Sequence, residues 1–149
     1  MSKQSGYQPE EQLWFTAEGE EDGQPLVFRG RQHLPSGVAE SDYPTRVRIF
    51  WPYESANESG MPDEETNDSQ MELEDALAEL DSPGVSSQML VVTGNGRKEW
   101  LWYVSDLGAW MERLNELLAG RPVFPIEIGN SHEPDWALYH DFISGLGGI

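Results

Sequence analysis

The stretch QMLVVTGNGRKEWLWYV at residues 88–104 decides how this chain folds. Two apolar runs flank Gly94-Asn95-Gly96, and Asn-Gly between such runs is the strongest short-range signal for a β-hairpin. We therefore expect two antiparallel strands, at residues 88–93 and 98–104, joined by a tight turn.

The second of these strands carries large side chains on both of its faces. Because side chains alternate along a strand, Trp100 and Trp102 point to one side, whereas Leu101 and Tyr103 point to the other. The N-terminal hairpin or the C-terminal segment can cover them. One alternative is an interface, with a partner or in a homodimer, through an open sheet face. Another is a platform on which single-stranded nucleic acid stacks.

Segments with helical patterns lie on both sides of the hairpin in the sequence. Pro62 followed by three acids predicts a helix over residues 63–80, because acids favour the positive end of the helix dipole. Ser105 or Asp106 caps a second helix, which carries a single apolar stripe and ends before Gly120.

Further strands are expected at residues 45–51 and 124–128, and a short helix at 134–143. Pro125 restricts the second strand to a sheet edge or to a position whose donor side faces solvent. From residue 45 the order is strand, helix, strand, strand, helix, strand. This order predicts an α+β fold with a ferredoxin-like βαββαβ antiparallel sheet and two helices on one face.

The N-terminal part adds a β-hairpin, with strands at residues 13–17 and 25–32, that either extends the sheet or covers its open face. We expect residues 1–11 to form a flexible tail and residues 12–149 to form a single domain.

The composition narrows the classes of function. The 149 residues include no cysteine, so disulfides and thiolate metal sites are excluded, and the net charge is −18. A field of that sign repels nucleic-acid phosphates and anionic lipid, so we expect neither direct nucleic-acid binding nor membrane binding. With no apolar segment that could form a signal peptide or a membrane span, we expect a cytoplasmic protein.

The charge is unevenly distributed along the sequence. Residues 54–81 contain eleven acids and no lysine or arginine, whereas four of the nine basic residues lie between positions 29 and 48. This asymmetry permits internal pairing between the two regions, and it equally permits an acidic face that meets a basic partner. The simplest reading of such a charge run is a solvated helix face that keeps the protein soluble.

No pattern of residues indicates catalysis, a cofactor or a metal. His132, Glu133, Asp135, His140 and Asp141 are close in sequence, but their spacing matches no zinc motif. There is no glycine-rich phosphate loop, and no nucleophile stands in an activated context. We therefore expect a non-enzymatic protein.

Several short motifs lie along the chain in a particular order: Asp22-Gly23-Gln24-Pro25, Tyr43-Pro44, Gly60-Met61-Pro62 with Glu64-Glu65, Glu74-Asp75, Thr93-Gly94-Asn95-Gly96-Arg97-Lys98-Glu99-Trp100 with Tyr103, and Glu133-Pro134-Asp135-Trp136 with Tyr139. Together they resemble a bacterial family known as domain of unknown function 695, over roughly residues 12–143. Glu133 stands where the closing motif of the family has Asp. The resemblance implies a compact α+β domain in the bacterial cytoplasm and implies no activity.

These observations lead to two hypotheses about function. The first is a protein-interaction or regulatory domain that binds a basic partner through the residues Glu64, Glu65, Glu72, Glu79, Arg97, Trp100 and Trp102. Arg97 belongs to a short basic cluster after the turn, which either docks a partner or pairs internally with the acidic helix. The alternative is a small-molecule-binding domain or an enzyme, with an aromatic pocket lined by Trp102, Tyr103, Trp136 and Tyr139.

Overall fold

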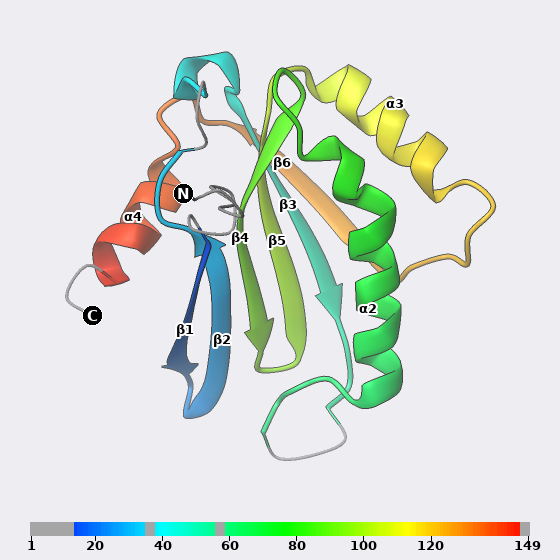
Figure 1. Cartoon of the computed structure of the whole chain (residues 1–149). Helices are drawn as coiled ribbons and strands as arrows, with labels where there is room; N and C mark the ends of the chain where they lie inside the picture. The colour runs from blue at the N-terminus through cyan, green and yellow to red at the C-terminus, as the bar shows by residue number, and fades with distance from the viewer. Residues whose placement is uncertain (1–13, 35–37, 56–58, 147–149) are drawn as a thin grey trace, which may run out of the picture.

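The computed structural model describes residues 14–34, 38–55 and 59–146, so the tail expected at residues 1–11 lies outside the described residues. A six-stranded antiparallel sheet runs through the molecule in the order β1-β2-β4-β5-β3-β6 (Figure 1). Its strands are β1 (Trp14–Glu21), β2 (Gln24–Arg31), β3 (Thr45–Pro52), β4 (Ser86–Gly94), β5 (Arg97–Val104) and β6 (Glu127–His132).

The sheet is larger than the four-stranded ferredoxin-like sheet that we expected. The N-terminal hairpin adds two strands, because β2 pairs with β4 from Leu26 opposite Gly94 to Gly30 opposite Leu90. The turn of that hairpin is only Asp22-Gly23, both residues having positive φ values of 51° and 80°, which fit a tight two-residue turn. The hairpin therefore extends the sheet and does not cover its open face.

Two helices cover one face of the sheet, as expected. They are α2 (Glu64–Leu77), which continues into a 3-10 turn at Ala78–Leu80, and α3 (Leu107–Leu118) (Figure 1). Their leucines and Trp110 pack against strand residues that include Ile49, Trp100 and Trp102. This first core explains why the leucines recur at helical spacing, since burying that stripe stabilises both helices.

A third helix, α4 (Ala137–Leu146), lies on the opposite face of the sheet (Figure 1). Trp136 and Tyr139 pack there with Leu101, Tyr103 and other strand residues in a second buried core. This helix begins at residue 137 and not at 134, because Trp136 has a positive φ of 54°, which no helix residue adopts. The second face of β5 is thus covered by the C-terminal segment.

Most strands begin or end one or more residues away from the predicted boundary; β1, for example, extends to Glu21 and not only to residue 17. Strand β6 begins at residue 127 and not at 124, so Pro125 lies outside the strand, consistent with its lack of an N–H donor. Strand β4 begins at Ser86, two residues early, and its pairing with β5 is irregular between Gln88 and Leu90. Among the described residues, no helix combines the length and the apolar character needed to cross a lipid bilayer.

Candidate functional site on helix α2

Helix α2 begins at Glu64, one residue after the predicted start, and Asp63 is its N-cap. The carboxylate of Asp63 accepts a 2.8 Å hydrogen bond from the backbone N–H of Thr66, and this bond holds the pKa of Asp63 below its usual value. Glu64 and Glu65 follow in the first turn, where their charges favour the positive end of the helix dipole. The first turn is therefore acidic for a local structural reason.

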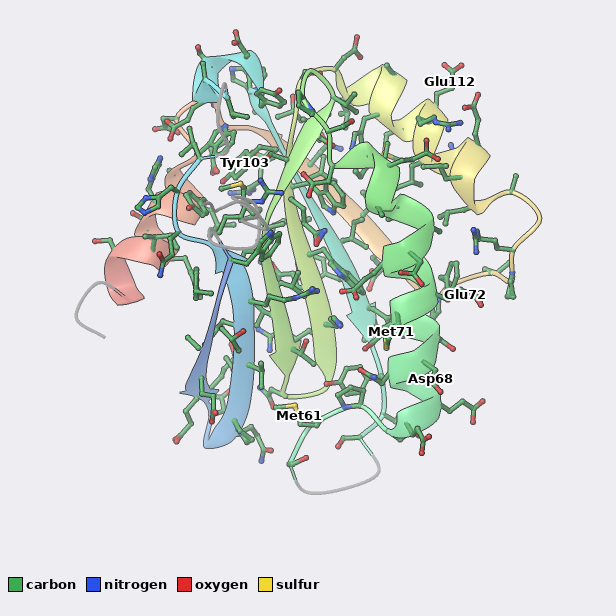
Figure 2. The ribbon with its side chains drawn as sticks, in the orientation of Figure 1. Met61, Asp68, Met71, Glu72, Tyr103 and Glu112 are labelled. Carbon is green, nitrogen blue, oxygen red and sulfur yellow. The ribbon has the colours of Figure 1, made fainter. Side chains whose placement is uncertain are left out.

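Beyond the first turn, carboxylates continue along the exposed side of the helix. Asp68, Glu72 and Asp75 each follow an earlier acid by three or four residues and so lie on one face with Glu64 and Glu65. We call this the acidic face and define it as Glu64, Glu65, Asp68, Glu72 and Asp75. Met71 lies among them with 51% of its surface exposed. Figure 2 shows Asp68, Met71 and Glu72 along α2, with Glu112 on the neighbouring α3.

The acidic face opposes the stability of its own helix. Asp68 is four residues from both Glu64 and Glu72, and like charges at that spacing destabilise a helix by about 0.2–0.5 kcal/mol per pair. Asp75 lies near the C-terminal end, where the dipole favours a cation, and the last turn contains no basic residue. Local helix stability accounts for Glu64 and Glu65 in the first turn but not for Asp68, Glu72 and Asp75.

Other acids of the same segment point inward. Glu74 Oε2 accepts hydrogen bonds of 2.8 Å from both Trp100 Nε1 and Arg29 Nη2, and lies 3.4 Å from Lys98 Nζ. Lys98 is only 8% exposed, and its burial lowers its pKa, an effect that the charge of Glu74 partly offsets. Glu74 therefore anchors α2 to strands β2 and β5.

Asp81, just after the 3-10 turn, forms a second anchor. Its Oδ2 pairs at 2.9 Å with Arg31 Nη2, and its Oδ1 accepts a bond from the backbone N–H of Gln88. Burial raises the pKa of Asp81, which the Arg31 charge counteracts. The structure thus contains both arrangements that the charge asymmetry permits, internal pairing by Glu74 and Asp81 and an outward acidic face.

Internal ion pairs occupy nearly all the cations of the described residues. Of the eight basic side chains there, seven lie within ion-pair distance of a carboxylate: Arg29, Arg31, Arg46, Arg48, Arg97, Lys98 and Arg113. The eighth, Arg121, donates to the carbonyl of Leu117. Within that same part of the chain, no cation pairs with a carboxylate of the acidic face, so its charge is left for the surroundings.

The remaining residues predicted to bind a partner are placed differently. Trp100 and Trp102 are each 2% exposed and lie under the helices, in the first core. Arg97 is half-buried and pairs at 3.1 Å with Glu21, while Glu79 is exposed and pairs at 2.9 Å with Arg113 on α3. Among the predicted residues, only Glu64, Glu65 and Glu72 belong to the acidic face.

The four residues predicted to line an aromatic pocket do not all meet. Trp136 stacks on Tyr103 with ring centroids 4.3 Å apart and an interplanar angle of 7°, and Tyr139 meets Trp136 edge-on at 6.2 Å. Trp102 faces the other core, as strand alternation requires. The three residues that do meet are at most 1% exposed and pack against one another.

A polar network that the sequence reasoning missed surrounds these rings. Glu133 accepts a 2.5 Å hydrogen bond from the Tyr103 hydroxyl, pairs at 2.7 Å with Arg46, and accepts a bond from the backbone N–H of Leu138 at the start of α4. Burial and the neighbouring Glu133 raise the pKa of Tyr103, and burial raises that of Tyr139 to about 12. Through Glu133, the network connects the start of α4 to strands β3 and β5 of the sheet.

His132 and His140, considered above as possible metal ligands, do not form a site with the acids that are close to them in sequence. His140 Nε2 contacts the carboxylate of Glu40, outside the polar network, whereas His132 is exposed on β6. Over residues 14–34, 38–55 and 59–146, no three His, Cys, Asp or Glu side chains gather closely enough to hold a metal ion.

Fold and site together define a class of protein, an α+β domain with a six-stranded antiparallel sheet and a carboxylate-rich helix on its surface. The chain belongs to the family of unknown function DUF695, whose model matches residues 12–144. The resemblance seen in the sequence motifs is therefore confirmed. No curated protein and no solved structure matches the chain.

Proposed function

We propose that this protein is a non-enzymatic interaction or regulatory domain that binds a basic protein partner through the acidic face of α2. The observation that carries the proposal is the contrast between the two sets of carboxylates on this segment. Glu74 and Asp81 are neutralised by cations of the sheet, while the acidic face has no cation partner among the described residues. A basic partner would supply the missing charge and relieve the repulsion within the helix.

Solubility alone is the competing explanation for the charge. A solubilising charge works wherever it lies on the surface, and it gains nothing from being concentrated on one helix at a cost to that helix. Natural sequences break such local rules mainly at functional sites. Met71, exposed within the acidic face, adds an apolar contact of the kind that adaptable binding surfaces use.

The test compares two triple variants that change the net charge equally. The first replaces Glu64, Glu65 and Glu72 by Gln, and the control replaces Glu18, Glu20 and Glu127, which are exposed acids on the edge strands. Each protein is used to capture partners from its native cell, with elution in steps of rising salt. We expect a salt-sensitive protein partner that the α2 variant loses and the edge-strand variant retains. The proposal would be contradicted if both variants lost the partner equally, or if neither variant lost it.

We also infer that the part of the fold from β3 onward is a ferredoxin-like unit to which the N-terminal hairpin is added. The order β4-β5-β3-β6 within the six-stranded sheet supports this inference, as does the placement of α2 and α3 on one face. The test is to solve the structure of a truncated chain that begins just before β3. We expect it to fold with the same four strands in the same order, and a chain that does not fold would contradict the inference.

A further inference from the structure

A groove lies at the end of α2, between the 3-10 turn with its following loop and the first turns of α3. Its volume is about 480 Å³. The lining includes Leu80 and Trp110, which are buried, and Val85 and Ala109, which are exposed. Glu79, in the 3-10 turn that continues α2, lines the groove, so the groove adjoins the end of the helix that carries the acidic face.

The polar groups near the groove already have partners. Ser105 Oγ lies 2.9 Å from the carbonyl of Gly84, Ser86 Oγ accepts a 2.9 Å bond from Trp110 Nε1, and Asp106 caps α3 through the backbone N–H of Ala109. The lining is polar and apolar in about equal parts, and because its polar groups are paired, the part without a partner is the apolar surface around Val85 and Ala109. Val85 is 36% exposed in this wall, although it is a large apolar side chain.

The charges at the groove decide which occupant fits. Arg113 is its only lining cation among the described residues, and its guanidinium is already bound at 2.9 Å by both Glu79 and Glu116. The carboxylate of Asp106 lines the groove as well. An anionic ligand would therefore meet more negative than positive charge, whereas an apolar side chain with cations beside it would meet complementary charge.

We propose that this groove receives a bulky apolar side chain of the basic protein partner, flanked in the partner by lysine or arginine residues. This inference rests on the proposed function and adds to it the chemistry of the recognised segment. The acidic face attracts and orients the partner, and the groove distinguishes one basic segment from another by burying its apolar residue.

The probes for the test are acetylated and amidated peptides KKAXAKK in which X is Ala, Leu or Trp. Their dissociation constants are measured by fluorescence anisotropy at low and at physiological salt. On the wild-type protein we expect X as Leu or Trp to bind about tenfold more tightly than X as Ala, because the larger side chain buries more apolar surface. The binding of all three peptides should weaken as the salt concentration rises.

The variant Ala109→Trp fills the groove and leaves the acidic face unchanged, and Ala137→Trp on α4 is the matched control. We expect the ratio between Leu and Ala peptides to fall to about one in Ala109→Trp and to persist in Ala137→Trp. Val85→Ser, which removes an apolar wall without adding bulk, should lower the same ratio and serves if Ala109→Trp does not fold.

The possible failures are distinguishable. A ratio near one on the wild-type protein, or a ratio that survives both groove variants, overturns the groove and leaves the acidic face standing if binding still depends on salt. Absence of binding by every peptide at low salt counts against the proposed function itself, and the groove proposal falls with it.

Discussion

The carboxylate of Glu74 on α2 accepts a 2.8 Å hydrogen bond from the indole nitrogen of Trp100 on β5. The same oxygen lies 2.8 Å from Arg29 and 3.4 Å from Lys98, so one acid joins a helix to two strands. Asp75, the next residue, is exposed and has no such role. Adjacent acids of one helix therefore serve different purposes, and substitutions should separate them.

We expect Glu74→Gln to destabilise the fold by about 2 kcal/mol, because the buried Lys98 would lose its main counter-charge. The matched control Asp75→Asn should change stability by less than about 0.5 kcal/mol, as is usual for exposed sites. The free energy of unfolding in urea, measured for both variants, checks this. Equal effects of the two substitutions would show that Glu74 is not an anchor.

Local patterns made much of this fold predictable. Leu73, Leu77 and Leu80 recur at helical spacing, and Gly94-Asn95-Gly96 separates two apolar runs, so α2 and the β4–β5 hairpin follow from short-range rules. The position of the N-terminal hairpin in the sheet did not follow, because the pairing of β2 with β4 joins residues that are sixty or more positions apart in the sequence. A hairpin that extends a sheet and a hairpin that covers its face can have similar local sequences, so the sequence does not distinguish the two placements.

The site was predictable to a similar degree. The run of acids on α2 was visible, and helical geometry even places Glu74 beside the buried leucine stripe, a signal that reasoning from charge alone overlooked. Which arginine meets which acid depends on strand order, and so it could not be inferred. The link from Glu133 to Arg46 and Tyr103 is of the same kind, since it joins three distant segments.

The hydrogen bond between Tyr103 and Glu133 should contribute to the stability of the folded protein. We expect Tyr103→Phe to destabilise the protein by about 1–3 kcal/mol, since it removes a bond to a charged acceptor while the ring can still stack on Trp136. In a double-mutant cycle with Glu133→Gln the two effects should not add. The control is Tyr53→Phe, because the Tyr53 hydroxyl donates to the carbonyl of Gly60 and not to Glu133. Its effect on the free energy of unfolding should add to that of Glu133→Gln, and a failure to add would contradict this account.

Stability should fall at alkaline pH because of the buried tyrosines. The pKa of Tyr139 is raised from 10.0 to about 12, and that of Tyr103 is raised as well. Since the folded state holds these protons more tightly, their stabilising contribution is complete below pH 10. That of Tyr139 is lost as the pH rises through about 12, and that of Tyr103 declines over the same alkaline range. Lys98 acts oppositely, because its lowered pKa gives a contribution that is complete above pH 10.5 and is lost as the pH falls.

The measurement is the free energy of unfolding between pH 8 and pH about 12, with tyrosinate absorbance recorded in parallel. Tyr103→Phe should have a shallower alkaline decline than the wild type. An unchanged decline would mean that other groups cause the alkaline loss.

Gly94 at the end of β4 should tolerate no side chain. Its φ is +140°, and a Cβ atom there would lie 2.5 Å from the carbonyl oxygen of Pro25 on β2. We expect Gly94→Ala to cost about 2 kcal/mol or more, since both the backbone and the neighbouring strand would have to shift. Gly129→Ala on edge strand β6, where a Cβ meets nothing within 4 Å, is the control and should cost little. Similar melting temperatures for the two variants would refute the steric argument.

Glu72 tests whether the acidic face is maintained at the expense of stability. It lies four residues from Asp68 and three from Asp75, so Glu72→Gln removes two repulsive pairs and should raise stability by about 0.5 kcal/mol. The gain should shrink at high salt, because screening already weakens repulsion between exposed charges. Glu18→Gln, an exposed acid on β1, is the control for loss of one charge. If thermal unfolding shows the same gain for both variants at low salt, the net charge and not the arrangement on α2 is responsible, and the argument that this helix gives up stability for binding loses its support.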